Sequence, residues 1–144
     1  DARKVGAEPR MLTATQLGFR AYAGVIFTSQ SYAQENQETI QAFVAALQQG
    51  YADFLANPQP VIEYINSEVN NDFLVEVGEA AAVIMQDLAV SQETESLGLG
   101  AMNAEVWNDV ATRMFEAGIV RNEVGASTLW TNEYLTSRDE QDVQ

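Results

Sequence analysis

The side chains able to do chemistry in this chain are mainly carboxylates, because the sequence contains no histidine and no cysteine. Two close acidic pairs are present, Glu76 with Glu79 and Glu93 with Glu95. Paired carboxylates can hold a cation or serve as an acid/base couple, but neither pair has the histidine or clustered aspartate loop that such sites need. We therefore interpret both pairs as solvated faces.

The missing histidine and cysteine exclude whole classes of active site. They remove Ser-His-Asp triads, Cys-His dyads, imidazole or thiolate zinc sites and disulfides, and they leave the redox compartment undetermined. The sequence therefore predicts no catalytic residue, no metal site, no cofactor and no enzymatic activity.

Two other features have both a chemical and a structural interpretation. Gly98-Leu99-Gly100 could cradle a phosphate, but it lacks the preceding strand and the further glycine or lysine of such loops, which favours a plain connector. Trp107 and Trp130 could line an aromatic pocket. Their position at helix starts within an apolar pattern favours packing in the core instead.

A short strand and a long helix are the first elements that could position such groups. The apolar run inside residues 24–29 predicts a buried strand. After a polar break, Asn36 is placed to cap a helix that Pro58 ends. One stripe of this helix, spaced by three and four residues, is predicted to face the core: Ile40, Phe43, Val44, Leu47, Tyr51, Phe54 and Leu55.

Further helices are predicted downstream. Pro60 opens a short helix, and Asn70 or Asn71 caps a longer one whose acidic residues lie mostly away from the core. The predicted core stripe of the longer helix is Phe73, Leu74, Val77, Ala81, Ile84, Met85 and Leu88.

Beyond that helix the chain breaks and resumes. Residues 91–96 are predicted to be a polar break, after which Asn103 caps another helix and Gly118 ends it in a left-handed conformation. A final turn or helix is predicted at residues 129–135. The residues of the Asn103 helix predicted to face inward are Val106, Val110, Met114 and Phe115.

Several short segments, taken in order, resemble the C-terminal half of the NMT1/THI5-like solute-binding proteins, the thiamine-pyrimidine-precursor relatives of nitrate, sulfonate and taurine binders. Gln37 departs from the proline usual at that helix start, and Asn103-Ala104 departs from the usual Asp-Pro. The segments that carry the resemblance are residues 22–28, 35–38, 42–46, 57–58, 98–107, 116–120 and 129–135.

The resemblance implies a mainly α fold with a short β element, as the C-terminal portion of a two-lobed α/β periplasmic binding protein of type II. Such proteins need about twice as many residues as the 144 present here. The chain also begins at Asp1 rather than at a methionine. We expect residues 1–135 to be the C-terminal part of a solute-binding protein that lacks its N-terminal half, and residues 136–144 to be a disordered polar tail.

The resemblance also places any surviving ligand contact in the loop that precedes the strand. It contains Phe19, Arg20 and Tyr22. A tyrosine there can stack on a flat heterocycle, and an arginine can offer its fork to a carboxylate, sulfonate or phosphate. The alternative is a hinge tyrosine packed on its own lobe beside a solvent-exposed arginine.

Composition limits the possible partners. The formal net charge is −14, so nucleic acid phosphates would be repelled and no nucleic acid partner is expected. With 47% hydrophobic residues there is ample material for a core, and no apolar run approaches the ~20 residues of a membrane-spanning helix.

The leading hypothesis is therefore the substrate-binding component of an ABC importer, periplasmic or otherwise extracytoplasmic. It would capture a small-molecule solute, a thiamine-precursor pyrimidine or a sulfonate or taurine-like anion, between two lobes and pass it to the ABC permease. The alternative is a stand-alone helical module that self-associates as a homo-oligomer. A third candidate, a pyrimidine synthase of the THI5 type, is weakened because those enzymes depend on an active-site histidine and a cysteine-rich segment.

Overall fold

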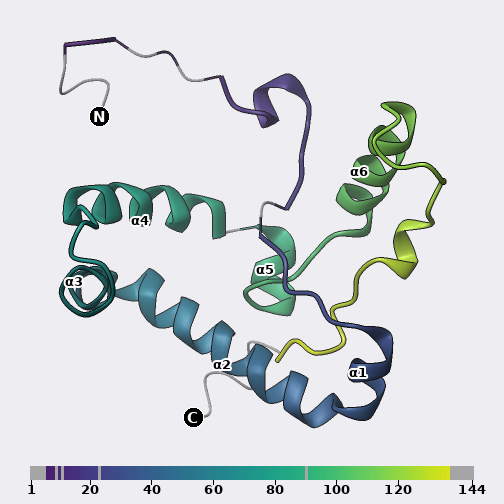
Figure 1. Ribbon diagram of the computed structural model, residues 1–144, viewed down its shortest axis with the longest axis horizontal. Coiled ribbons are helices and arrows are strands. Elements are labelled where there is room, and N and C mark those ends of the chain that lie inside the picture. The colour runs from purple at the N-terminus through teal and green to yellow at the C-terminus, as the bar shows by residue number, and fades with distance from the viewer. Residues whose placement is uncertain (1–5, 9, 11, 23, 90, 137–144) are drawn as a thin grey trace. The chain divides into compact units, whose positions relative to one another are not determined.

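The computed structural model describes residues 6–8, 10, 12–22, 24–89 and 91–136, and this part of the chain is helical (Figure 1). The polar tail predicted at residues 136–144 lies almost wholly outside it. Three short elements, η2 (Thr15–Leu17), the π-helical η3 (Ile65–Val69) and η4 (Ala126–Thr128), accompany the α-helices. The α-helices are α1 (Gln30–Glu35), α2 (Gln37–Ala56), α3 (Gln59–Tyr64), α4 (Val75–Ala89), α5 (Gln92–Leu97) and α6 (Ala104–Glu116).

The chain divides into two compact units, each built from two stretches of sequence. The first unit comprises Asp1–Ile26 with Ala104–Trp130, and the second comprises Phe27–Asn103 with Thr131–Gln144. Among the described residues, no helix is both long and apolar enough to cross a membrane.

The predicted short β element, and with it the α/β part of the fold class, was wrong. No strand occurs in the described part of the chain, and residues 24–28 are irregular and make no hydrogen bond there. The side chains predicted to be buried are exposed: Ile26 by 66% and Phe27 by 89%. A strand needs a neighbour to satisfy its backbone groups, and an apolar run alone does not supply one.

The predicted long helix is present as α2. It begins directly after Asn36 and ends before Asn57 and Pro58, as expected. Asn36 does not cap it with its side chain, however, because its amide Nδ2 donates instead to the carbonyl of Tyr32 at 3.0 Å. On the predicted core stripe, Phe43 remains 53% exposed.

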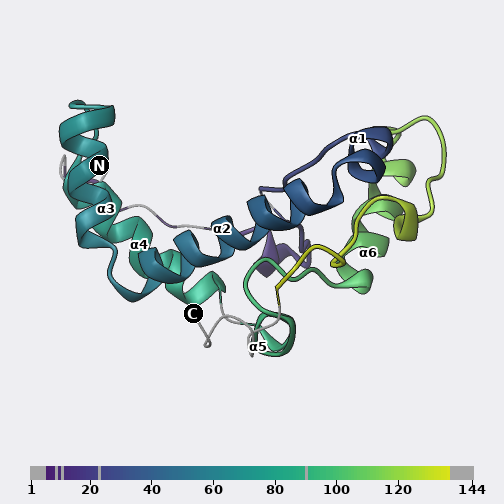
Figure 2. The same cartoon turned by 90° about the horizontal axis from the view of Figure 1, so that it is seen from below.

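The tightest packing in the second unit lies where α3 meets α4. Ile62 of α3 is 1% exposed, and the ring of Phe73 and the methyl group of Ile62 lie against the bare Cα of Gly78. A Cβ built on Gly78 would come within 2.9 Å of the Phe73 ring and 3.0 Å of the Ile62 methyl group, so glycine here permits the close approach of α3 and α4. Figures 1 and 2 both show α3 and α4 together at the end of α2.

The predicted core face of α4 was wrong for most of its residues, although Phe73 and Met85 are half-buried. The helix begins at Val75 rather than near Asn71, and its buried residues are Gly78 and Ala82. Small side chains on that face allow close packing, so the larger apolar residues were left outside. The predicted stripe is exposed at Leu74, Val77, Ala81, Ile84 and Leu88.

The predicted polar break at residues 91–96 is mostly the helix α5. Ser91 and Thr94 form a capping box, in which each side chain accepts from the other residue's backbone N–H at 3.1 and 2.8 Å. Gly98 ends the helix at a φ of 92°. The reciprocal cap supplies partners for amides that would otherwise be unpaired in so short a helix.

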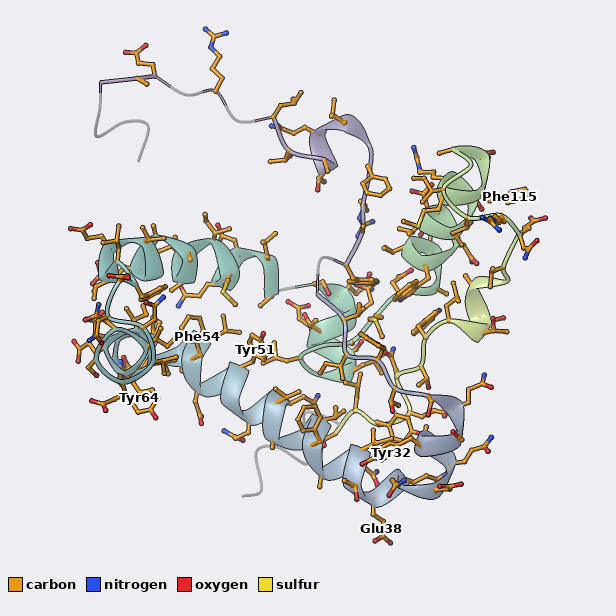
Figure 3. The ribbon with its side chains drawn as sticks, in the orientation of Figure 1. Tyr32, Glu38, Tyr51, Phe54, Tyr64 and Phe115 are labelled. Atoms are coloured by element: carbon orange, nitrogen blue, oxygen red, sulfur yellow. The ribbon has the colours of Figure 1, made fainter. Side chains whose placement is uncertain are left out.

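In the first unit, α6 ends as predicted. Gly118 has a φ of 68° and donates to Phe115, while Ile119 donates to Met114, which together form a Schellman motif. The predicted inward face is only partly buried. Val106 is 7% exposed, whereas Phe115, labelled in Figure 3, is 40% exposed.

Two side-chain amides fasten the last described residues of the second unit. Gln48, 4% exposed, donates to the carbonyls of Leu99 and Thr136 at 2.9 and 3.3 Å and accepts from the Thr136 N–H at 2.9 Å. Asn132 accepts from the Met102 N–H at 3.1 Å and donates to the Met102 carbonyl at 3.0 Å. The turn predicted at residues 129–135 is present at its end, where Leu135 donates to Asn132.

Candidate functional site

The loop predicted to contact a ligand is shaped by the short helix η2. Thr13 and Gln16 brace its start, since each backbone N–H donates to the other residue's side chain, at 3.0 and 3.2 Å. Gly18 ends the turn in the left-handed region with a φ of 76°. The chain then leaves η2 in an extended conformation toward Tyr22.

Tyr22 pairs with Trp107 from the first turn of α6. The ring centroids are 6.0 Å apart and the planes are inclined at 37°, within the range of favourable aromatic pairs. Both side chains are only half-buried. The pair therefore keeps part of its aromatic surface open within the first unit, where a flat ring could stack.

An arginine of α6 ties the same loop to the helix. Arg113 donates through Nε to both carboxylate oxygens of Asp109 at 2.8 Å and through Nη2 to the Gly18 carbonyl at 3.3 Å. The Arg113 and Asp109 side chains are 50% and 39% exposed, so the ion pair contributes at most about 1 kcal/mol. Its main effect is to orient the Gly18 end of the loop.

The three residues predicted for the site are brought together only in part. Tyr22 has an aromatic partner, Phe19 is half-buried, and Arg20 is exposed without a hydrogen bond or ion pair to the described residues. The arginine is thus available to solvent, as the alternative interpretation of this loop expected. Whether these residues bind a ligand stays a prediction.

Trp107, the partner of Tyr22, was predicted from the sequence to pack in the core. It does pack, but against Tyr22 rather than in a closed interior. The only signal for this was an aromatic residue at a helix start, which does not indicate its partner.

A hollow of about 370 Å³ lies elsewhere in the first unit, between α6 and the segment before η4. Tyr22, Arg20 and Phe19 are not among its lining residues. Its polar lining includes Asn108, Thr112 and Glu123.

The two acidic pairs stay apart from other potential metal ligands in the described part of the chain. No group of three histidine, cysteine or carboxylate residues able to hold a metal is found among the residues that the structure describes. Glu93 instead accepts a hydrogen bond from the side-chain amide of Asn103, so it joins α5 to the segment before α6.

Comparison with known proteins confirms the resemblance drawn from the sequence segments. Residues 1–61 match the family model described as NMT1/THI5 like. The chain is also 27% identical, over 135 residues, to the riboflavin-binding protein RibY of Chloroflexus aurantiacus. That alignment covers 92% of this chain and 38% of RibY, so the chain spans well under half the length of this relative. No solved structure matches.

The matched relative is a binding protein by name, which agrees with the prediction of a chain that binds a solute rather than transforming one. The family match rests on the sequence of residues 1–61, whereas the aromatic pair is a contact seen in the structure. The match covers the loop with Phe19, Arg20 and Tyr22, whereas Trp107 lies beyond it.

Proposed function

We propose that this chain is part of the substrate-binding component of an ABC importer, which captures a small organic solute outside the cytoplasm and delivers it to a membrane permease. Support comes from the NMT1/THI5-like match and the riboflavin-binding relative. Binding without catalysis also suits a chain that has neither histidine nor cysteine.

The solute class proposed is a flat heteroaromatic ring, either a flavin or a thiamine-precursor pyrimidine. The observation that carries this choice is the half-buried pair of Tyr22 and Trp107. Aromatic side chains stack on such rings and contribute about 0.5–1.5 kcal/mol beyond the area they bury. The relative's name supplies riboflavin as the first compound to test.

A sulfonate or taurine-like anion is the second candidate, and Arg20 is the observation that favours it. The guanidinium is exposed and has no partner among the described residues, so it could offer two donors to an anion. The net charge of −14 opposes this choice, because it repels anionic solutes at long range.

A fluorescence titration tests the proposal. Stacking quenches riboflavin fluorescence, so adding the chain to riboflavin is expected to give saturable quenching. Tyr22→Ala and Trp107→Leu are each expected to weaken binding by about tenfold, which corresponds to ~1.4 kcal/mol. Tyr32→Ala is the matched control, since Tyr32 lies on α1 and is 47% exposed.

The outcomes separate the two solute classes. Binding of riboflavin or a pyrimidine that depends on Tyr22 but not on Tyr32 supports the proposal. Binding of taurine or an alkylsulfonate that depends on Arg20, without binding of either ring compound, would replace the solute class. A thermal-shift screen in which none of these compounds raises the melting temperature would overturn the binding function for this chain.

A further inference from the structure

Helix α4 has two apolar stripes of the same spacing, and only one of them is packed. The helix contacts α3 and α2, and the members of its inner stripe are all buried or half-buried: Val75, Gly78, Ala82, Met85 and Ala89. The outer stripe starts just before the helix, and its members Leu74, Val77, Ala81, Ile84 and Leu88 are all exposed. Leu88 is 77% exposed and Ile84 56%. Such a stripe normally faces another element.

The outer stripe has the pattern of a coiled-coil seam. Its residues are spaced by three, four, three and four positions, which keeps them on one line along a helix that pairs with another helix. No charged residue lies within it. The acidic residues of α4, Glu76, Glu79 and Asp87, lie around the helix on the other side.

We propose that this outer stripe is the contact surface for a second copy of the chain, with the two α4 helices antiparallel. In that arrangement Ala81 faces Ile84 and Val77 faces Leu88 of the other copy, so small and large side chains alternate across the seam. Antiparallel packing also places opposite ends of the helix dipoles together. Because the acidic side of α4 faces away, pairing brings no carboxylates together across the seam.

The available area sets the expected strength. Covering one large aliphatic side chain removes roughly 60–120 Å² of apolar surface from water. Four large stripe residues on each of two copies therefore give about 500–1,000 Å², to which Ala81 adds little, at the low end for a specific interface. The dimer is expected to be reversible, with a dissociation constant in the roughly micromolar range.

The effect of salt on dimerisation distinguishes this apolar contact from a contact between charged residues. Each copy carries a net charge of −14, so two copies repel one another outside the seam. Raising ionic strength screens that repulsion while leaving the apolar contact in place. The dimer is therefore expected to tighten with added salt, whereas binding of a basic partner would weaken.

Sedimentation of the full chain tests the proposal, with two adjacent variants on α4. Ile84→Glu puts a carboxylate in the seam and is expected to raise the dimer dissociation constant by tenfold or more. Val83→Glu is the matched control, because Val83 is 61% exposed on the same helix but lies outside the stripe. It is expected to leave dimerisation unchanged. Leu88→Gln, in the last turn, gives a second seam variant if Ile84→Glu does not fold.

Helix orientation is tested with cysteines, since the chain has none of its own. Mixing Ala81→Cys chains with Ile84→Cys chains is expected to give mainly the mixed disulfide, whereas parallel helices would favour the two self-pairs. A monomer at all concentrations would overturn the proposal, as would a dimer lost in Val83→Glu but kept in Ile84→Glu.

Discussion

Residues 131–136 and residues 24–28 are both irregular stretches of chain, but only the first is tied by side-chain amides to residues far away in the sequence. In the second unit, Gln48 bonds to both backbone groups of Thr136, and Asn132 bonds to both backbone groups of Met102. Residues 24–28 make no hydrogen bond with the described part of the chain. The segment at residues 131–136, which contains a turn, is thus held by side-chain amides, whereas residues 24–28 have no such partner among the described residues.

The two segments differ in the hydrogen-bond partners that surround them rather than in their own backbone groups. A side-chain amide carries a donor and an acceptor like a peptide group, so Gln48 can satisfy the backbone of Thr136 and Asn132 that of Met102. Residues 24–28 are the more apolar of the two segments. Apolar residues alone do not order extended chain, because its backbone groups also need partners.

Replacing Gln48 with methionine is expected to lower the free energy of unfolding more than any other change proposed for these two segments. Gln48→Met keeps the length of the side chain but leaves the Thr136 N–H and the carbonyls of Leu99 and Thr136 without this partner. We expect a loss of about 2–3 kcal/mol in the free energy of unfolding, measured in urea. The adjacent control is Gln49→Met, because Gln49 is exposed and its side chain bonds, among the described residues, to Asp53 alone. Equal losses in both variants would show that the buried amide has no special effect.

Replacing Asn132 with alanine is expected to have the next largest effect. Asn132→Ala removes the two hydrogen bonds to Met102 but leaves a half-buried site that water can partly reach. The expected loss is about 1–2 kcal/mol. Asn122→Ala serves as the control, since Asn122 is exposed, and a comparable loss there would argue against the Met102 contact.

The two amides hold the same segment to the same loop, which predicts that their effects are coupled. In a double-mutant cycle of Gln48→Met and Asn132→Ala, the combined loss is expected to fall short of the sum by about 0.5–1 kcal/mol, because either change alone already loosens residues 131–136. Strict additivity would mean that the two contacts stabilise independent parts of the second unit.

Helices could be predicted from the sequence because their signals are local. The span of α2 follows from a three-and-four spacing that ends before Pro58, and the end of α6 follows from Gly118. The face of α4 could not be predicted in the same way. Both of its stripes have the same spacing, and Gly78 and Ala82 look less hydrophobic than Ile84 and Leu88 although they allow the closest packing.

Contacts between segments that lie far apart in the chain could not be predicted from the sequence. Nothing near Gln48 indicates that it bonds to Thr136, and nothing near Trp107 indicates that it pairs with Tyr22. The resemblance predicted the loop that contains Tyr22, but it did not provide its aromatic partner. The same limit explains the wrong prediction at residues 24–29, because a strand depends on a neighbour that an apolar run does not specify.

The smallest expected effect comes from the unpaired segment itself. Phe27 is 89% exposed, so Phe27→Ser removes almost no packing, and the melting temperature of the isolated chain should change by an amount equivalent to less than about 0.5 kcal/mol. Phe43→Ser on α2, where 53% of the side chain is exposed, should cost more because part of that ring is packed. If Phe27→Ser proved the more costly change, residues 24–28 would have a partner in solution, and the contrast with residues 131–136 would disappear.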